Sequence, residues 1–140
     1  MLRQHLSTLR IRTPGRGLLE ITGEVRSRVT QSGITSGLVT LFVRHTSASL
    51  LIQENADPDV RGDLDRFFAR LVPDGDTLFR HRDEGVDDMP AHIRSALTAT
   101  QLSVPVSGHR MMLGTWQGLY VWEHRLRPHR RELTLHLVGE

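Results

Sequence analysis

Three histidines of this 140-residue chain stand at the ends of predicted structural elements. His45 follows an apolar strand, His92 lies near the start of a predicted helix, and His124 follows another strand. Neutral imidazole is the commonest metal ligand in proteins, and three imidazoles with one open position are typical of catalytic zinc. No H-x-E-x-H spacing accompanies them, so a structural role for each histidine is the alternative. We predict that His45, His92 and His124 bind one divalent metal ion, with zinc favoured.

Strand alternation places two of these histidines at the rim of the core. Side chains on a strand alternate between faces, so the apolar face of residues 37–44 continues into His45. In residues 117–125 the face that carries Tyr120 and Trp122 continues into His124. Rims where a core turns polar are places where pockets form, although ordinary core packing also explains the aromatic pair.

The elements that must position these residues are mostly strands. Alternating or β-branched runs predict strands near 4–12, 18–30, 37–44, 49–54, 100–106, 109–114, 117–124 and 131–138. Helical spacing predicts helices over 57–72 and 87–98. We therefore expect a mostly β, compact, sandwich-like single domain over residues 1–140, with about two helices.

Each predicted helix starts with an aspartate. Asp57 is expected to be an N-cap followed by Pro58 in the first turn, and Asp88 is expected to cap the second helix and aim His92 into the site. Capping alone would explain both aspartates. Any catalytic role for them therefore has to be separated from this structural one.

The composition excludes several kinds of chemistry. There is no cysteine, and all 18 basic residues are arginine, so thiolate and lysine Schiff-base chemistry are absent. No run of 18 apolar residues predicts a membrane span, and the first residues lack a signal peptide's apolar core, so we expect a cytoplasmic protein. The one basic run, residues 124–131, is either a solvated turn or a patch for anions or nucleic acid.

Three long motifs carry a resemblance to a known family. They read HTSASLLIQENADPDVRGDL (45–64), HRDEGVDDMPAHIRSALTATQLSVPV (81–106) and LGTWQGLYVWEHR (113–125). In these motifs the chain resembles the YjbQ (UPF0047) family, also called secondary thiamine-phosphate synthase. The resemblance implies a compact β-sandwich with a few helices, assembled as a homotrimer, and a weak ability to make thiamine phosphate.

The resemblance also implies which polar residues line a shared site. Matched position by position, the substrate-binding residues are Thr46, Ser47, Asn55, Trp116, Gln117 and Glu123. The catalytic residues are Asp57, Glu84 and Asp88, beside the metal ligands His45, His92 and His124.

Several functions fit these residues. Thiamine-phosphate synthesis joins an aminopyrimidine pyrophosphate to a thiazole phosphate, and its leaving group calls for a cation (zinc, or magnesium for pyrophosphate) or for arginines such as Arg44, Arg94 and Arg125. A metal-dependent hydrolase would use Asp57, Asp88 or Glu84 as its base. A non-catalytic protein that binds a small anionic or phosphorylated metabolite would look the same in sequence. Nucleic-acid binding is the weakest alternative, because aromatic and basic residues are not interleaved.

Overall fold

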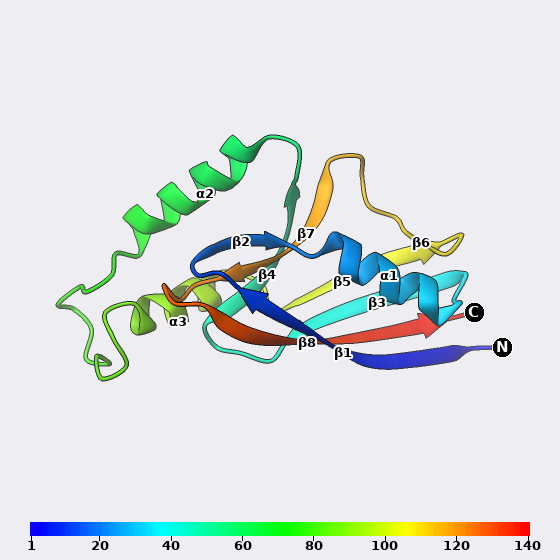
Figure 1. Cartoon of the computed structure of the whole chain (residues 1–140), viewed down its shortest axis with the longest axis horizontal. Helices are drawn as coiled ribbons and strands as arrows, with labels where there is room; N and C mark the ends of the chain where they lie inside the picture. Colours follow the sequence, from blue (N-terminus) through cyan, green and yellow to red (C-terminus); the bar gives the residue numbers. More distant parts are fainter.

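Two antiparallel sheets face each other in the computed structural model, which describes residues 1–140 (Figure 1). The five-stranded sheet has the order β1 (Arg3–Thr13), β8 (His129–Gly139), β3 (Ser36–Val43), β5 (Gln101–Ser107) and β6 (Arg110–Met111). The three-stranded sheet has the order β2 (Gly17–Glu20), β7 (Gln117–Glu123) and β4 (Ala48–Glu54). The helices are α1 (Thr22–Ser32), α2 (Pro58–Leu71) and α3 (Asp88–Leu97). The mostly β, sandwich-like prediction is confirmed.

Strand alternation builds the core as the sequence indicates. The buried residues of β3 are Val39, Leu41 and Val43, and β8 runs beside this strand with a buried leucine at every second position. These side chains belong to one cluster of 18 buried apolar residues between the sheets. Burial of apolar area at about 25 cal/mol per Å² makes such a cluster the main stabilising contribution to the fold.

The predicted strand over 18–30 is wrong after its first residues. β2 ends at Glu20, and α1 follows at once. Its buried residues, Thr22, Val25, Val29 and Ser32, recur at helical spacing rather than at every second position. The β-branched residues favour a strand locally, but the periodicity of burial decides the outcome. The helix ends at Gly33, which has the left-handed φ of 70°.

The predicted strand over 109–114 shrinks to the two residues of β6. Gly108 and His109 form the turn before it, with φ values of 58° and 65°. After Met111 the chain leaves the ladder, and the Met112 amide donates to the Pro105 carbonyl. The other strands match their predicted ranges to within a few residues.

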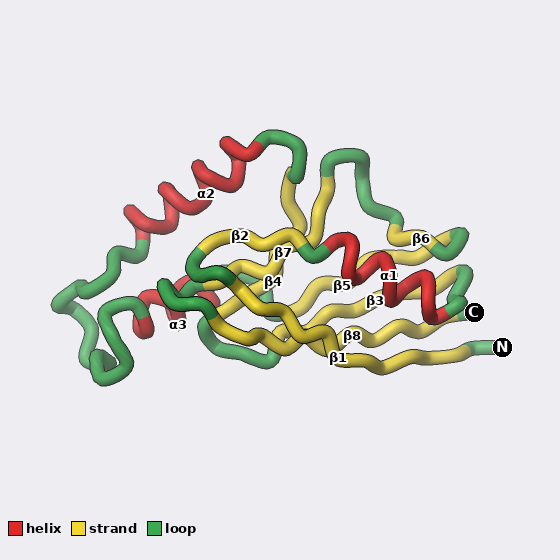
Figure 2. Tube along the Cα trace, in the orientation of Figure 1, coloured by secondary structure: helices red, strands yellow, loops and turns green.

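The residues between β4 and β5 lie outside the two sheets (Figures 1 and 2). After β4 the chain runs into α2, returns through a long loop and enters α3, which packs beside β4. Asp57 caps α2 as predicted, since its side chain accepts the amide of Asp59 at 2.9 Å. No helix here combines the length and the apolar character that a membrane crossing would need.

Candidate metal centre

A buried carboxylate at the start of α3 lies between two imidazole rings. Asp88 Oδ2 is 2.6 Å from His81 Nε2 and 3.1 Å from His92 Nε2. One ligand atom from each of these three residues lies within 4.8 Å of the other two. The Asp88 side chain is 3% exposed, while those of His81 and His92 are 43% and 33% exposed. The group therefore has a buried base and an open side.

Local structure explains how these residues meet. Asp88 and His92 are one helical turn apart on α3, so they lie on the same side of the helix. Asp88, Ala91 and Ser95 form the buried face, and the Ser95 hydroxyl donates to the Ala48 carbonyl of β4. His81 comes from the loop between α2 and α3.

Arg125 holds the other side of this helix start. Its Nη1 donates to Asp88 Oδ1 at 2.7 Å, and its Nε donates to Asp87 Oδ2 at 2.9 Å. Its Nη2 donates to the Glu84 carbonyl. One arginine thus occupies one oxygen of Asp88 and leaves the other oxygen to the histidines.

The predicted capping role of Asp88 is wrong. Asp87 is the N-cap residue, it makes no side-chain capping bond, and Asp88 is the first helical residue. The prediction failed because two consecutive aspartates precede the apolar positions, and both are occupied by Arg125 rather than by the helix amides. Capping of α3 therefore does not explain why an aspartate occupies position 88.

The proton positions on His92 are constrained. Its Nδ1 is 3.1 Å from the Thr46 carbonyl oxygen, which only accepts, so Nδ1 carries a hydrogen. In the neutral ring Nε2 then presents a lone pair to Asp88 Oδ2. An ionised carboxylate also only accepts, so this pair is repulsive unless the ring takes a second proton or a cation lies between the two atoms.

Asp88 is ionised at neutral pH. Burial alone would raise its pKa, but the hydrogen bond from His81 and the charge of Arg125 outweigh burial and hold the pKa below its usual value. A permanently anionic oxygen facing two imidazole nitrogens is a suitable ligand set for a divalent cation.

Two imidazoles and one carboxylate fit zinc. This donor set occurs at catalytic zinc ions, where a fourth position stays open for water or substrate. The contact from His92 Nδ1 to a backbone carbonyl is the usual way of orienting a zinc-binding imidazole. The exposed side of the group leaves room for that fourth ligand.

The three histidines predicted as ligands do not converge within the chain. His92 alone belongs to the group. His45 Nε2 accepts the Glu132 amide at 2.8 Å on the outer side of β8. His124 is fully buried, and its Nε2 contacts the Ser49 hydroxyl at 2.8 Å. Burial, followed by the charge of Arg94, lowers the pKa of His124 to about 3.

The predicted substrate-binding residues fall into two groups at opposite ends of the β4–β7 ladder. Glu123 pairs with Ala48 at one end, and Gln117 pairs with Glu54 at the other, six residues away. At the strand rise of about 3.3 Å per residue the ends are roughly 20 Å apart. Thr46, Ser47 and Glu123 lie at the end near α3, whereas Asn55, Asp57, Trp116 and Gln117 lie at the far end.

Several of these residues already have partners. Ser47 accepts Arg131 through its hydroxyl and its carbonyl, and Glu123 is completely buried with Arg131. Asn55 donates to Glu20, and the Gln117 side chain accepts the Gly114 amide. Trp116 is exposed, and so is Glu84, whose carbonyl rather than its carboxylate contacts Arg125.

Sequence reasoning missed His81. It lies in a loop without periodicity, seven residues before Asp88, so no helix or strand pattern connects it to the site. Its position as the first residue of the second motif was the one available signal.

The arginines expected to bind a leaving group are all engaged. Arg125 binds Asp87 and Asp88, and Arg44 lies 3.6 Å from Glu132. Arg94 is buried and donates to the Val72 carbonyl. An anion therefore has to find other donors.

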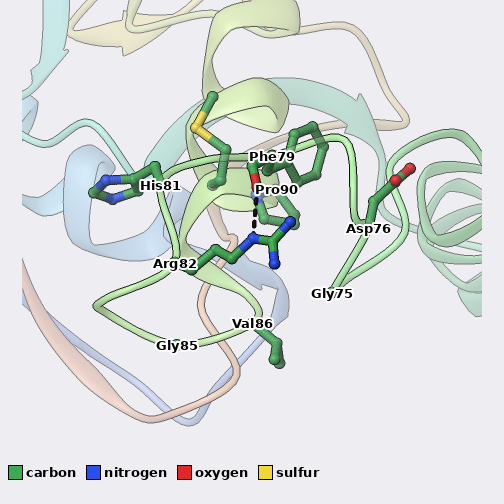
Figure 3. A pocket seen from close by; sticks show the side chains of 9 residues that line it. Gly75, Asp76, Phe79, His81, Arg82, Gly85, Val86 and Pro90 are labelled. Atoms are coloured by element: carbon green, nitrogen blue, oxygen red, sulfur yellow. Dashed lines mark hydrogen bonds between the residues drawn. The ribbon is translucent and has the colours of Figure 1, made fainter.

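A cleft of about 160 Å³ lies between the loop and the start of α3 (Figure 3). Arg82 fills part of it and donates to the carbonyls of Phe79 and Thr77, which holds the loop together. In Figure 3 the ring of His81 points away from Arg82. His81 lines this cleft, whereas Asp88 and His92 are not among its lining residues.

Comparison with known proteins gives the family. The model of the family described as UPF0047 protein YjbQ-like matches residues 7–140. A UPF0047 protein of Synechocystis is 56% identical over 99% of this chain and 94% of its own, and the UPF0047 protein YjbQ of Escherichia coli O157:H7 is 42% identical over 95% and 96%.

Solved structures agree with this assignment. A conserved hypothetical protein of Thermus thermophilus superposes with a TM-score of 0.84 at 36% identity, covering 94% of this chain and 98% of its own. A protein of unknown function from Sulfolobus solfataricus gives 0.90 at 21% identity over both full chains, which shows the shared fold. The Thermus protein is described as hypothetical and the Sulfolobus protein as of unknown function, and none of the four names gives an activity. The chain belongs to the YjbQ (UPF0047) family.

Proposed function

We propose that the chain binds a divalent cation, with zinc favoured, through His81, Asp88 and His92, and acts on a small anionic or phosphorylated metabolite. The observation that carries the proposal is the position of two imidazole Nε2 atoms on one oxygen of a buried, ionised carboxylate. The second nitrogen of His92 is committed to Thr46, so the contact between Nε2 and Asp88 needs either a second proton on the ring or a cation, and the proposal assigns it a cation.

Each residue has a distinct role in this proposal. His81 and His92 supply neutral nitrogen ligands, and Asp88 supplies charge. Arg125 fixes the orientation of the Asp88 carboxylate, and the Thr46 carbonyl fixes the tautomer of His92. A bound cation would polarise a substrate oxygen or lower the pKa of a bound water.

Thiamine-phosphate synthesis is the one named reaction that the family resemblance implies, and a metal-dependent hydrolase is the alternative. Asp57 lies at the far end of the β4–β7 ladder, so it is a poor candidate for the base in either reaction. A cytoplasmic location stays a prediction.

A loading experiment tests the catalytic part. Protein stripped with a chelator is reloaded with zinc or magnesium, then assayed for thiamine phosphate formation and for hydrolysis of simple phosphate esters. Turnover that depends on the metal and disappears in Asp88→Asn supports an enzyme. Saturable binding without product in every condition supports a non-catalytic binding protein.

We also propose a homotrimer. The outer face of the five-stranded sheet exposes Leu6, Leu38 and Phe42, and α2 exposes Phe67 and Leu71. Contact between copies would remove these apolar side chains from water. Light scattering at micromolar concentration should give about three chain masses, and a monomer mass would contradict the proposal.

A further inference from the structure

A second hollow lies on the outer side of the five-stranded sheet, where β1 ends and β8 begins. Its volume is about 550 Å³, and it is lined by Arg10, Ile11, Arg12, His45, Arg130, Arg131 and Glu132. Four arginines against one glutamate give its lining a net positive charge. The basic run of residues 124–131 contributes Arg130 and Arg131 to this lining, so part of the run belongs to a concave surface.

Arg12 and Arg130 are unusual within this hollow. They are direct partners across the β1–β8 ladder, and both are exposed. Like charges directly opposite each other on neighbouring strands destabilise a sheet. Neither side chain makes a hydrogen bond or an ion pair in the structure.

The other arginines around the hollow have carboxylate partners. Arg10 and Arg44 lie 3.8 and 3.6 Å from Glu132. Arg131 binds the buried Glu123. Within the lining, Arg10 and Arg131 are therefore paired with carboxylates, whereas Arg12 and Arg130 are not. Neither packing nor stability explains why two unpaired arginines lie opposite each other.

His45 adds a neutral donor to the lining. Its Nε2 accepts the Glu132 amide, so the ring hydrogen is on Nδ1. Nδ1 has no partner within the chain. The hollow thus offers two free guanidinium groups and one free imidazole N–H, which are the donors that a phosphate group accepts.

We propose that Arg12, Arg130 and His45 bind the phosphate group of a small phosphorylated metabolite. Two guanidinium groups on adjacent strands can each donate a pair of hydrogen bonds, and the dianion removes their mutual repulsion. The hollow has the size of a small-molecule site rather than an extended groove, which favours a metabolite over a nucleic-acid strand.

The position of this hollow connects it to the proposed metal centre. His45 lines the hollow, and the carbonyl of the next residue, Thr46, orients His92. The further role of this hollow as the substrate subsite of an enzyme rests on the proposed function. Phosphate binding in the hollow needs no metal, so it can be tested, and refuted, independently of the proposed metal centre.

The test measures phosphate binding to chelator-treated protein. Inorganic phosphate and pyrophosphate are titrated by calorimetry into the wild type and into Arg12→Gln, Arg130→Gln and His45→Asn. Arg70→Gln, which replaces an exposed arginine of α2 outside the hollow, is the matched control. Each free-arginine variant should weaken binding by about tenfold or more, and Arg70→Gln should change it by less than about threefold.

Thermal unfolding adds a second readout. Without phosphate, Arg12→Gln should melt at the same temperature as the wild type or above it, because it removes like-charge repulsion. With phosphate, the wild type should gain stability and the variant should not. Absence of binding in the wild type, or equal losses in Arg12→Gln and Arg70→Gln, would overturn the site. Binding of an oligothymidine without any binding of phosphate or pyrophosphate would overturn it in favour of nucleic acid.

Discussion

Glu123 and Asp88 are both buried carboxylates that pair with an arginine, but their other contacts differ. Glu123 is 0% exposed and its partner Arg131 is 4% exposed, and the Thr13 hydroxyl and the Arg125 amide complete its contacts. Asp88 has Arg125 on one oxygen and two partly exposed imidazoles on the other. The first group is closed, and the second is open to solvent on one side.

The pKa values of Glu123 and Asp88 are shifted in the same direction. Burial alone would raise the pKa of each carboxylate, but hydrogen bonds and neighbouring charge hold both pKa values below their usual range. The pKa direction therefore does not distinguish a structural carboxylate from a ligand. The distinction lies in the partners, because Arg131 and Thr13 are fixed donors whereas His81 and His92 can exchange a proton for a cation.

The largest expected effect is on stability. Glu123→Ala leaves the buried Arg131 charge without its carboxylate partner, with only Ser47 as a neutral acceptor, and should lower the free energy of unfolding by about 3–5 kcal/mol. Asp88→Ala should cost only about 1–2 kcal/mol, because His81 and His92 are partly exposed to solvent and Arg125 keeps its pairing with Asp87. Urea unfolding at one protein concentration, without metal, measures both. Equal costs would remove the difference between the closed and the open group.

A smaller effect concerns pH, at His124 next to Glu123. The folded state keeps this ring neutral down to a pKa of about 3, while the unfolded chain takes up a proton below about 6.5. The unfolded state therefore binds more protons between these values, and stability falls as pH falls. The wild type should lose about 2 kcal/mol from this group between pH 7.5 and 5. His45, whose pKa burial also lowers, adds to the loss in the same direction.

The control for the pH effect is His124→Gln. It should be less stable at pH 7.5 but show a flatter dependence in the same buffers with a chelator present. An unchanged slope would place the titrating group elsewhere. The lowered pKa values of Glu123 and Asp88 act below about pH 4, so they do not disturb this window.

The smallest expected effect is at Asp57, a carboxylate that caps α2. Asp57→Ala should cost about 1 kcal/mol, since it removes the bond to the Asp59 amide, and Asp57→Asn should cost little. Zinc binding should be unchanged in both variants. A loss of metal or substrate binding in Asp57→Asn at unchanged stability would show that Asp57 has a role beyond capping α2.

Period-two alternation predicted most of the fold from sequence. The residues of β3 and β8 reveal which side chains meet in the core, and Asp57-Pro58 marks the start of α2. The alternation failed at α1, where burial follows a helical period through residues that favour strands. Local patterns are reliable where packing and propensity agree.

The site was less predictable because it depends on contacts between distant segments. His92 and Asp88 could be paired from helical spacing, but His81 reaches them from a loop, and Arg125 reaches them from beyond β7. Alternation placed His45 and His124 at strand ends correctly. It could not show that His45 accepts a backbone amide or that His124 is sealed against Ser49.

Zinc titration of variants tests the central claim most directly. Calorimetry on chelator-stripped protein at neutral pH should give one site per chain, weakened by about a hundredfold or more in His81→Ala, His92→Ala and Asp88→Asn. His45→Ala and His124→Gln should stay within about threefold of the wild type, with circular dichroism confirming that every variant is folded. Zinc binding that survives His81→Ala and Asp88→Asn but is lost in His45→Ala or His124→Gln would contradict the metal centre described for α3.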